Sequence, residues 1–364
     1  MTLTGKKYTE REIIEDVIKY IISHRLPVDT KLASSEMMAE RYNVSAMTVN
    51  RAITKLAKRG IVYRRSGSGT FVGKVVPGKS HIKVKIFNWQ YSKSDPLAIA
   101  AYGTFYNALL KGLEHFGFQV STSEKQPFHD KIFTGEHVEK FDLLIVPGGM
   151  VNCQTVPLLK KLKTPIVMIN NEKLSPWPFH QVFHDYVPGF EKALSYIKKI
   201  GYSKIFIAGM AGETSEFRSE QLLQCARQEK MQCEILPFMS GIYSNQPHVA
   251  YLSGQEHGKY CIEHKLEGIV FTLSDFIAFG IVDILSEHNV KIGNKLKLVS
   301  YDNIESRRSY SKEPVLTSIT HPLEQMAEHV VELVEYIVNH KIECEESNYI
   351  IRVPASELVI RSSA

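Results

Sequence analysis

The sequence predicts an α/β protein: an N-terminal winged helix-turn-helix, then a larger part made of two lobes with parallel sheets. Three observations support this fold class. The chain has 364 residues, more than one ordinary domain needs. The pattern of its first seventy residues predicts short helices followed by a β-hairpin. Beyond residue 82, apolar strand-like runs alternate with helical ones. We expect a first domain at 1–73, a linker at 74–81 and a two-lobed domain at 82–364.

The first predicted helix lies in "YTEREIIEDVIKYIISHRL". Thr9 and Glu12 have the spacing of a capping box, in which each side chain accepts a hydrogen bond from the other's backbone amide. One apolar stripe follows at helical spacing and consists of Ile13, Ile14, Val17, Ile18, Ile21 and Ile22. Pro27 cannot continue a helix, so we expect the helix to end before it.

Two further helices are predicted before residue 60. The second starts near Ser34 or Ser35 and stops at Asn43, a residue that tolerates a left-handed conformation. Ser45 caps the third helix, which ends at Gly60. Two short helices joined by a tight turn form a helix-turn-helix. On its second helix, helical spacing turns Val49, Ile53 and Leu56 inward and Ala46, Met47, Asn50 and Arg51 outward.

The stretch "IVYRRSGSGTFV" predicts two strands around a glycine turn, with Arg64 and Arg65 leading into a tip at 66–69. Residues 1–80 hold 15 Lys and Arg against 7 Asp and Glu. This is a net charge of +8 in a chain of net charge +5, so the remainder is about −3. A helix that offers side chains to base edges, beside a basic hairpin that offers charge to phosphates, suits duplex DNA. The alternative is an ordinary helical domain with a solvated charged face.

The segment "TKLASSEMMAERYNVSAMTVNRAITKLAKRGIVYRRSGSGTFV" resembles the winged-helix domain of GntR-type transcription regulators. The resemblance implies DNA contacts from Ser34, Ser45, Ala46, Met47, Thr48, Asn50 and Arg51 in the helices and from Arg64, Arg65, Ser66, Gly67, Ser68, Gly69 and Thr70 in the hairpin. Many members of that family carry Arg where this chain has Met37, Ala46 and Asn50. Fewer guanidinium groups imply weaker reading of guanine, and Asn50 could read adenine instead.

Beyond the linker, short apolar runs alternate with helical ones. Predicted strands include "IKVKIFNW", "FDLLIVPGG", "TPIVMINN", "QVFHDY", "SKIFIAGM", "LEGIVFT" and "KLKLVSYD". Continuous apolar strands between helices indicate parallel sheets covered on both faces. Nearly 280 residues are too many for one such sheet, so we expect two lobes. Ligands of such folds bind at the carboxyl ends of the strands.

No motif in this part indicates catalysis or a cofactor. The glycines of "IVPGGM" and "IAGMAGE" form neither a dinucleotide fingerprint nor a P-loop, and no G-x-S-x-G or H-E-x-x-H spacing occurs. Five cysteines without C-x-x-C spacing indicate reduced thiols and no zinc site. No apolar run approaches a membrane span and no apolar signal region opens the chain, so we expect a cytoplasmic protein without a membrane partner.

From Ile82 onward the chain resembles the effector domain of LacI/GalR-type regulators, which is similar to periplasmic sugar-binding proteins. Four landmarks carry this resemblance, in order: "HDYVPGFEKALSYIKKIGYSKIFIAG", "FTLSDFIAFGIVDIL", "LVSYDNIESRRSYSKEPVLTSITHP" and "ELVIRSSA". A GntR-type head with this body resembles the arabinose-type repressors. The hinge helix of LacI-type heads is absent from the sequence, and the 74–81 linker takes its place.

The resemblance implies a sugar site between the lobes. Its predicted residues are Asp302, Arg218, Asp185, Ser274, His321, Trp89 and Trp177, with the tryptophans stacking on a ring face. Some have structural alternatives. Asp185 could cap the following helix, Arg218 could be a charge on a helix surface, and both tryptophans could be core residues. Asp275, next to Ser274, could also cap a helix, and we favour that role for it. Asp302 follows an apolar strand, where a carboxylate needs a partner.

These observations predict a non-enzymatic transcription regulator, by default a repressor, that binds palindromic operator DNA as a homodimer. The predicted effector is a mono- or small oligosaccharide. Two alternatives remain. One is the same architecture with a nucleobase or other small metabolite as effector. The other is an enzyme with a DNA-binding appendage.

Overall fold

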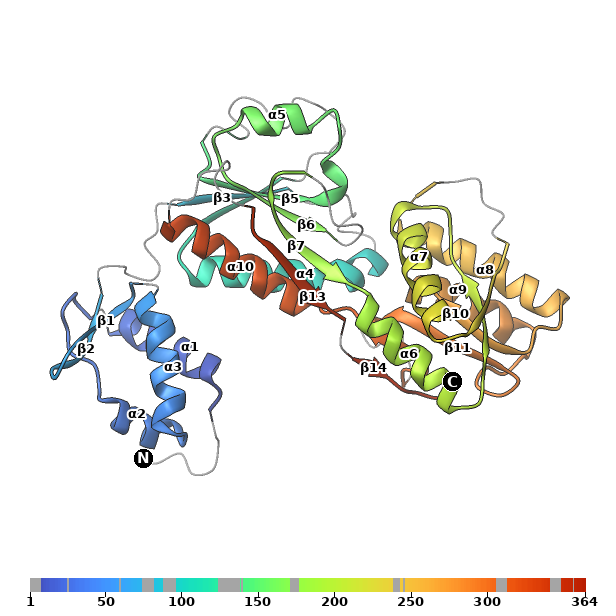
Figure 1. The fold of residues 1–364 in the computed structure, drawn as a ribbon, viewed down its shortest axis with the longest axis horizontal. Helices are drawn as coiled ribbons and strands as arrows, with labels where there is room; N and C mark the ends of the chain where they lie inside the picture. The colour runs from blue at the N-terminus through green and yellow to red at the C-terminus, as the bar shows by residue number, and fades with distance from the viewer. Residues whose placement is uncertain are drawn as a thin grey trace.

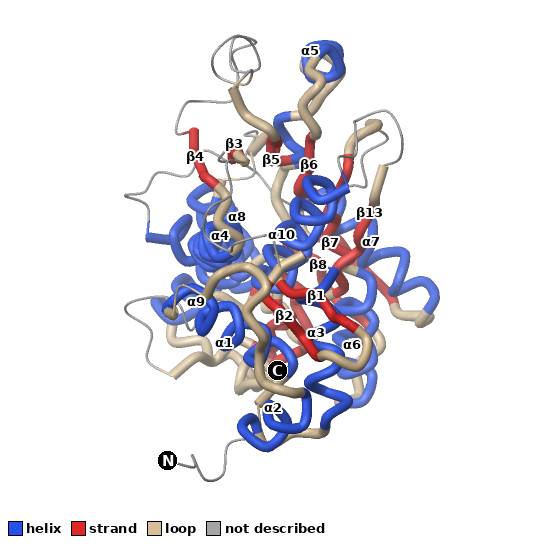
Figure 2. Tube along the Cα trace, turned by 90° about the vertical axis from the view of Figure 1, so that its left-hand side faces the viewer, coloured by secondary structure: helices blue, strands red, loops and turns tan. Residues whose placement is uncertain are grey.

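The structure is a computed structural model that describes residues 8–24, 26–58, 60–73, 82–87, 96–123, 138, 140–170, 177–237, 243–244, 246–305, 313–340, 348–355 and 357–364. These residues form an N-terminal helical domain with a hairpin, and two lobes that each contain a six-stranded sheet (Figure 1). The strands lie between helices, as expected for an α/β protein (Figure 2). The predicted linker at 74–81 and the candidate Trp89 lie outside the described residues.

The N-terminal domain has three helices and a two-stranded hairpin. Its elements are α1 (Glu10–Ser23), α2 (Ser35–Tyr42), α3 (Ala46–Lys58), β1 (Val62–Arg65) and β2 (Gly69–Val72). The capping box is confirmed, since the Thr9 amide donates to Glu12 Oε2 at 2.8 Å and the Glu12 amide donates to Thr9 Oγ1 at 3.2 Å. Asn43 ends α2 with φ 51°, and Ser45 Oγ accepts from the Thr48 amide at 3.2 Å, so both predicted boundaries hold.

This domain has a hydrophobic core of its own. Ile13, Ile14, Val17, Ile18 and Ile21 of α1 share this core with the inward face of α3, which includes Val49, Ile53 and Leu56. Ala46, Met47, Asn50 and Arg51 are exposed on the opposite face, as their helical spacing predicts.

The first lobe is built on a parallel sheet in the order β13-β7-β6-β5-β3-β4. Its elements are β3 (Lys83–Phe87), α4 (Pro96–His115), β4 (Gln119–Ser123), β5 (Leu143–Pro147), η3 (Gly148–Met150), α5 (Val156–Lys161), β6 (Ile166–Asn170), β7 (His180–Asp185), α10 (Leu323–His340) and β13 (Ile350–Pro354). Alternate residues of β5 face opposite sides: Leu143 and Ile145 pack under α4 and α10, whereas Leu144 and Val146 pack toward α5.

The second lobe has the strand order β14-β12-β11-β10-β8-β9, parallel except for the edge strand β14. Its elements are α6 (Val187–Lys199), β8 (Lys204–Ala208), α7 (Glu213–Gln228), β9 (Gln232–Ile235), α8 (Pro247–Glu263), β10 (Gly268–Thr272), α9 (Asp275–Glu287), β11 (Leu296–Asp302), β12 (Thr317–Thr320) and β14 (Leu358–Val359). Helices α8 and α9 pack closely, and a Cβ on Gly280 would lie 2.1 Å from the Tyr251 carbonyl oxygen.

The chain passes between the lobes three times, after β7, after β12 and after β13. Each passage leaves the carboxyl end of a strand. Two passages are joined directly, because the Ala355 amide donates to the Asp185 carbonyl at 2.9 Å. Side chains from both lobes therefore meet where the strands end, which is the edge at which α/β folds bind ligands.

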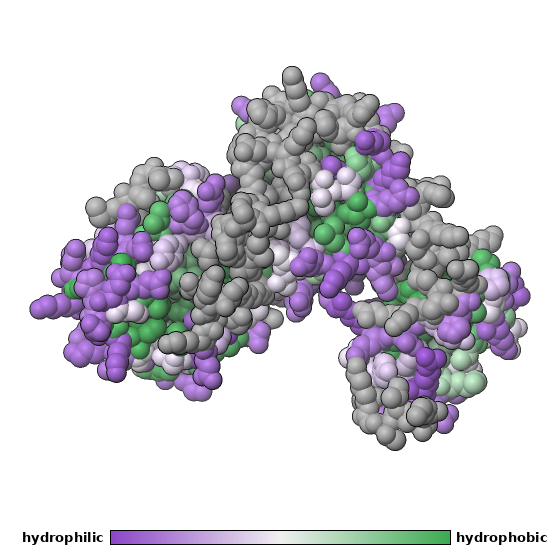
Figure 3. Space-filling model, turned by 180° about the vertical axis from the view of Figure 1, so that it is seen from behind, coloured by the Kyte–Doolittle hydropathy of each residue, from purple (hydrophilic) through white to green (hydrophobic). Residues whose placement is uncertain are grey.

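Hydrophilic residues cover much of the surface seen from behind, and hydrophobic residues form only scattered patches there (Figure 3). None of the described helices is both long and apolar enough to cross a bilayer.

Candidate functional site

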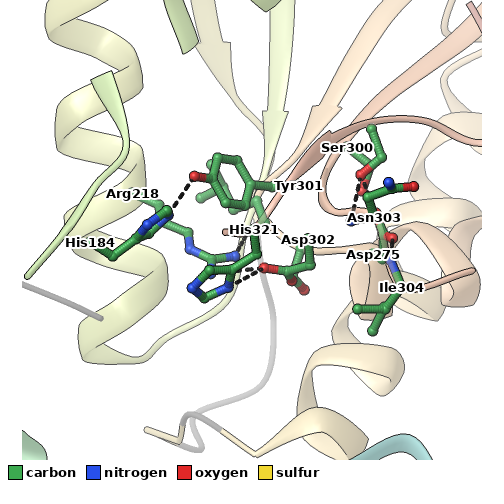
Figure 4. A network of polar contacts seen from close by, with 12 residues as sticks. His184, Arg218, Asp275, Ser300, Tyr301, Asp302, Asn303, Ile304 and His321 are labelled. Carbon is green, nitrogen blue, oxygen red and sulfur yellow. Dashed lines mark hydrogen bonds and ion pairs between the residues drawn. The ribbon is translucent and has the colours of Figure 1, made fainter. Parts of the chain in front are cut away.

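A buried ion pair lies at the carboxyl end of the second sheet (Figure 4). Asp302 is the last residue of β11, and Arg218 extends from the second turn of α7. Arg218 Nη2 lies 2.9 Å from Asp302 Oδ1, and Arg218 Nη1 donates to the Leu273 carbonyl at 2.6 Å. Both residues are less than 10% exposed. The structure therefore brings together two residues that the sequence predicts for a ligand site.

The charges of this pair depend on each other. Burial by itself raises the pKa of Asp302, but the nearby Arg218 charge and the His321 hydrogen bond outweigh it and lower the pKa below the ordinary value. Burial likewise lowers the pKa of Arg218, whereas Asp302 and two tyrosine rings raise it overall. Both groups are thus charged near neutral pH.

Asp302 has an unusual backbone conformation and an available oxygen. Its φ is 109°, in a region that non-glycine residues rarely occupy, and such strain clusters at functional sites. The contacts with Arg218 and His321 both use Oδ1. No described residue donates a hydrogen bond to Oδ2, which points away from His321 in Figure 4. This oxygen can accept a hydrogen bond from a ligand.

Aromatic rings enclose the Arg218 guanidinium group. Its Cζ lies 4.6 Å from the ring centroid of Tyr301 and 5.1 Å from that of Tyr186. Both tyrosines are fully buried, and their rings fix the guanidinium plane through cation–π contacts. The Nε atom of Arg218 is buried without a hydrogen-bond partner among the described residues. It therefore offers a second unused polar atom, beside Asp302 Oδ2.

Two stacked histidines connect the ion pair to the first lobe. His321 follows β12, and its Nδ1 lies 3.6 Å from Asp302 Oδ1. Its ring stacks on that of His184 in β7, with centroids 4.3 Å apart. His184 Nε2 and the Tyr301 hydroxyl are hydrogen-bonded at 2.7 Å. Burial, together with the charges of His321 and Arg218, holds the pKa of His184 well below its usual value, so His184 is neutral.

Asp275 corrects one prediction. It does not cap α9; Ser274 does, with its Oγ accepting from the Ile277 amide at 3.4 Å. Asp275 is fully buried, and its carboxylate accepts from the Ile304 amide and from Ser318 Oγ, both at 2.7 Å. Burial, and then the Asp302 charge, raise the pKa of Asp275 to about 7. Asp275 thus supports the loop that follows Asp302.

Three other predicted residues make contacts of their own, and one of them, Asp185, lies close enough to Tyr301 for its charge to raise the pKa of that tyrosine. Ser274 caps α9, and the Asp185 carboxylate accepts from the Val187 amide at 3.2 Å in the first turn of α6. Trp177 precedes the first residue of β7, whereas His184 and Asp185 end that strand. Trp177 is half-buried against the first-lobe cluster that contains Leu144 and Phe179, so its packing matches the alternative of a core residue.

Sequence reasoning missed His184, Tyr186 and Tyr301. Each is next to a predicted residue, in "HDY" and "SYDN". Successive side chains of a strand point to opposite faces. Choosing Asp185 and Asp302 for the site therefore implies that their strand neighbours, His184 and Tyr301, face away from it. The available signal was an apolar strand that ends in polar aromatic residues. Within the described residues, no group of three or more His, Cys, Asp or Glu side chains is arranged to hold a metal ion.

A second candidate surface combines α3 with the hairpin. Ser35 Oγ donates to Asn50 Oδ1 at 2.9 Å, and Arg64 Nη2 donates to the same oxygen at 3.0 Å. Arg64 therefore lies against the exposed face of α3. Ser34 and Ser45 have capping roles, with their hydroxyl oxygens accepting from the Met37 and Thr48 amides.

Arg65 lies on the other face of the hairpin from Arg64, because neighbouring strand residues alternate. Its Cζ is 5.3 Å from the ring centroid of Tyr63 and 5.1 Å from that of Phe71, and its Nη2 is 3.7 Å from Asp29. The tip that follows requires glycine, since Gly67 and Gly69 have φ of 70° and 115°. The two arginines therefore have different environments, which the sequence alone did not indicate.

Comparison with known proteins identifies both parts of the chain. Residues 9–72 match the bacterial regulatory proteins of the gntR family, and residues 195–364 match the periplasmic binding protein-like domain. The chain joins a gntR helix-turn-helix domain to a periplasmic-binding-protein-like domain. The first match includes α3 and the hairpin, and the second includes both Arg218 and Asp302.

Two relatives are similar to this chain over nearly its whole length. The arabinose metabolism transcriptional repressor of Halalkalibacterium halodurans is 26% identical, over 91% of this chain and 88% of its own length. The protein of the same name from Geobacillus stearothermophilus is 21% identical, over 97% and 96%.

Solved structures share the fold of the two lobes. A LacI family transcriptional regulator from Enterococcus faecium with bound ribose has a TM-score of 0.60 and 17% identity, and covers 78% of this chain and 98% of its own. A complex of the transcriptional regulator CelR with cellobiose has a TM-score of 0.59 and 17% identity, and covers 88% and 90%. These likenesses establish a LacI-type fold for the periplasmic-binding-protein-like domain.

Proposed function

We propose that this protein is a transcriptional repressor that binds operator DNA through residues 1–73 and releases it when a sugar binds between the two lobes. One combination of features in a single chain carries the proposal. The exposed helix α3 and the basic hairpin belong to the gntR-type domain, and a buried Arg218–Asp302 pair lies at the strand ends of the second lobe. Full-length relatives are named as arabinose repressors, which supports the same combination of roles.

The chemistry of the ion pair suits a polyhydroxylated ligand. Asp302 Oδ2 and Arg218 Nε supply one acceptor and one donor that no described residue uses. A sugar presents hydroxyl groups that can both donate and accept, so adjacent hydroxyls can satisfy both atoms. Solved relatives of the same fold hold ribose and cellobiose, which supports a sugar of one or two rings.

Regulation follows from where the site lies. His184 belongs to the first lobe and Asp302 to the second, and both lie near the passages between the lobes. A ligand that contacts this group favours one relative placement of the lobes, and coupling of this kind typically changes DNA affinity by ~1–3 kcal/mol. We propose that the protein acts as a cytoplasmic homodimer on a palindromic operator, because a two-fold protein suits a two-fold site.

The test uses the full chain. Duplexes are selected from a random library, and the enriched site is titrated by fluorescence anisotropy with and without a panel of pentoses, hexoses, disaccharides and nucleobases. We expect an enriched palindrome that one sugar releases by roughly 5–150-fold. Release by a nucleobase alone would replace the sugar in the proposal. Absence of any enriched sequence would refute the repressor function.

A further inference from the structure

The side chain of Asn50 is held in one orientation on the exposed face of α3. Its Oδ1 accepts from Ser35 Oγ at 2.9 Å and from Arg64 Nη2 at 3.0 Å. Arg64 Nη2 also lies 3.4 Å from the Asn50 carbonyl oxygen, so one guanidinium nitrogen contacts both oxygens of the residue. A carboxamide oxygen has two lone pairs, and both are used here.

In this arrangement the Asn50 side chain can act toward DNA only as a hydrogen-bond donor. Its Nδ2 makes no hydrogen bond with another described residue. Bidentate reading of adenine needs Oδ1 to accept from the N6 amino group while Nδ2 donates to N7. Because Ser35 and Arg64 occupy Oδ1, Asn50 in this geometry can only donate, and its partner on a base must be an acceptor.

Apolar side chains lie beside Asn50 on the same helix. Ala46 is one turn before it on the outward face, and Met47 is next to Ala46 with 65% of its surface exposed. A large apolar side chain exposed to this extent at the start of a recognition helix gains by covering apolar surface in the groove. The only apolar group on the major-groove edge of the bases is the thymine methyl, and the O4 acceptor lies beside it.

We propose that Asn50, Ala46 and Met47 are specificity-determining residues that read a T·A base pair. Asn50 Nδ2 donates to thymine O4, and Ala46 and Met47 cover the thymine methyl. Arg64 acts as a positioning residue, because it fixes the carboxamide from the hairpin. This inference deepens the proposed function and rests on it, since it names the base pair that the repressor recognises.

The test starts from the duplex enriched by selection with the full chain. Two changes are made at each thymine in turn. Replacing thymine by uracil removes only the methyl group, and replacing it by 5-methylcytosine opposite guanine keeps the methyl but replaces O4 by an amino group. At one thymine of each half-site we expect uracil to weaken binding about fourfold, the value for one buried carbon. We expect 5-methylcytosine to weaken it roughly tenfold or more.

Matched variants assign each contact. Met47→Ala should bring the thymine-to-uracil ratio close to one, whereas Met47→Leu should keep it. Asn50→Ala should reduce the penalty for 5-methylcytosine and leave the uracil effect unchanged. Arg64→Ala frees one of the two lone pairs of Asn50 Oδ1, because Ser35 still occupies the other. It should therefore reduce the preference for thymine without removing the methyl effect. These ratios do not depend on the total amount of folded protein.

Two results would overturn the inference. One is an enriched site in which uracil is tolerated at every thymine. The other is a uracil effect of the same size in wild type and Met47→Ala. Both outcomes leave sequence-specific DNA binding intact, so they are distinct from failure of the repressor function, in which no sequence is enriched at all.

Discussion

Replacing Asp302 by Ala tests the separation of ligand binding from DNA binding. The change removes the carboxylate that pairs with Arg218 at 2.9 Å and leaves a guanidinium group that is only 6% exposed without its counterion. Breaking a buried pair in this way costs about 3–5 kcal/mol. For a unit of 150–250 residues this corresponds to a melting temperature lower by roughly 6–20 °C.

The effect should be confined to the second lobe. The N-terminal domain has its own core, which shares no residue with the cluster that contains Tyr301. DNA affinity, measured by fluorescence anisotropy below the melting temperature, should therefore remain within about twofold of wild type. Sugar affinity, measured by calorimetry with the effector found in the panel, should fall roughly 100-fold or more, because hydrogen bonds to charged groups are lost.

Asp302→Asn is the matched control. It keeps an acceptor for Arg218 at Oδ1 and suits the positive φ of 109° better than Ala, so its stability should lie between those of wild type and Asp302→Ala. Its sugar affinity should still fall, because the charge is gone. Equal loss of sugar and DNA affinity in Asp302→Ala, or unchanged sugar affinity in both variants, would refute separate sites with Asp302 as a ligand residue.

Three further predictions concern other parts of the chain. The pKa of Asp275 is about 7 in the folded protein against the ordinary 3.8, so between about pH 4 and 7 the folded state holds a proton on Asp275 that the unfolded state has lost, and stability falls as pH rises. Asp275→Asn should flatten this part of the profile of melting temperature against pH. An unchanged slope would count against this role of Asp275. Arg65→Ala should weaken binding to all duplexes alike and lower the slope of log K against log salt by about 1, whereas Arg64→Ala should alter base preference. Identical behaviour of the two variants would contradict the assignment of the two arginines to opposite faces of the hairpin. Gly280→Ala would place a methyl group 2.1 Å from the Tyr251 carbonyl oxygen and should destabilise the second lobe by about 1–3 kcal/mol, measured by chemical denaturation. A variant as stable as the wild type would disprove this prediction.

Sequence alone determined the N-terminal domain because its signals are local. The capping box joins Thr9 and Glu12 across three positions, Ser45 caps a helix through an amide three positions later, and the glycines of the hairpin tip have positive φ within one turn. The parallel sheets of both lobes were also predictable, since strands buried on both faces are apolar along nearly their whole length, as in β5 and in β10 up to Phe271. Neither inference requires knowing which distant segments meet.

The polar site needed the tertiary structure. Resemblance to a family could nominate Arg218 and Asp302, but only the tertiary structure shows them paired, and His184 reaches Tyr301 across 117 positions. Ser274 and Asp275 are adjacent and both suit a helix cap by local rules. A hydrogen bond from Ser318, 43 positions away, gives Asp275 its different role. Local rules describe what a side chain can do within a few residues, whereas the partner that it finds depends on which strand ends the fold brings together.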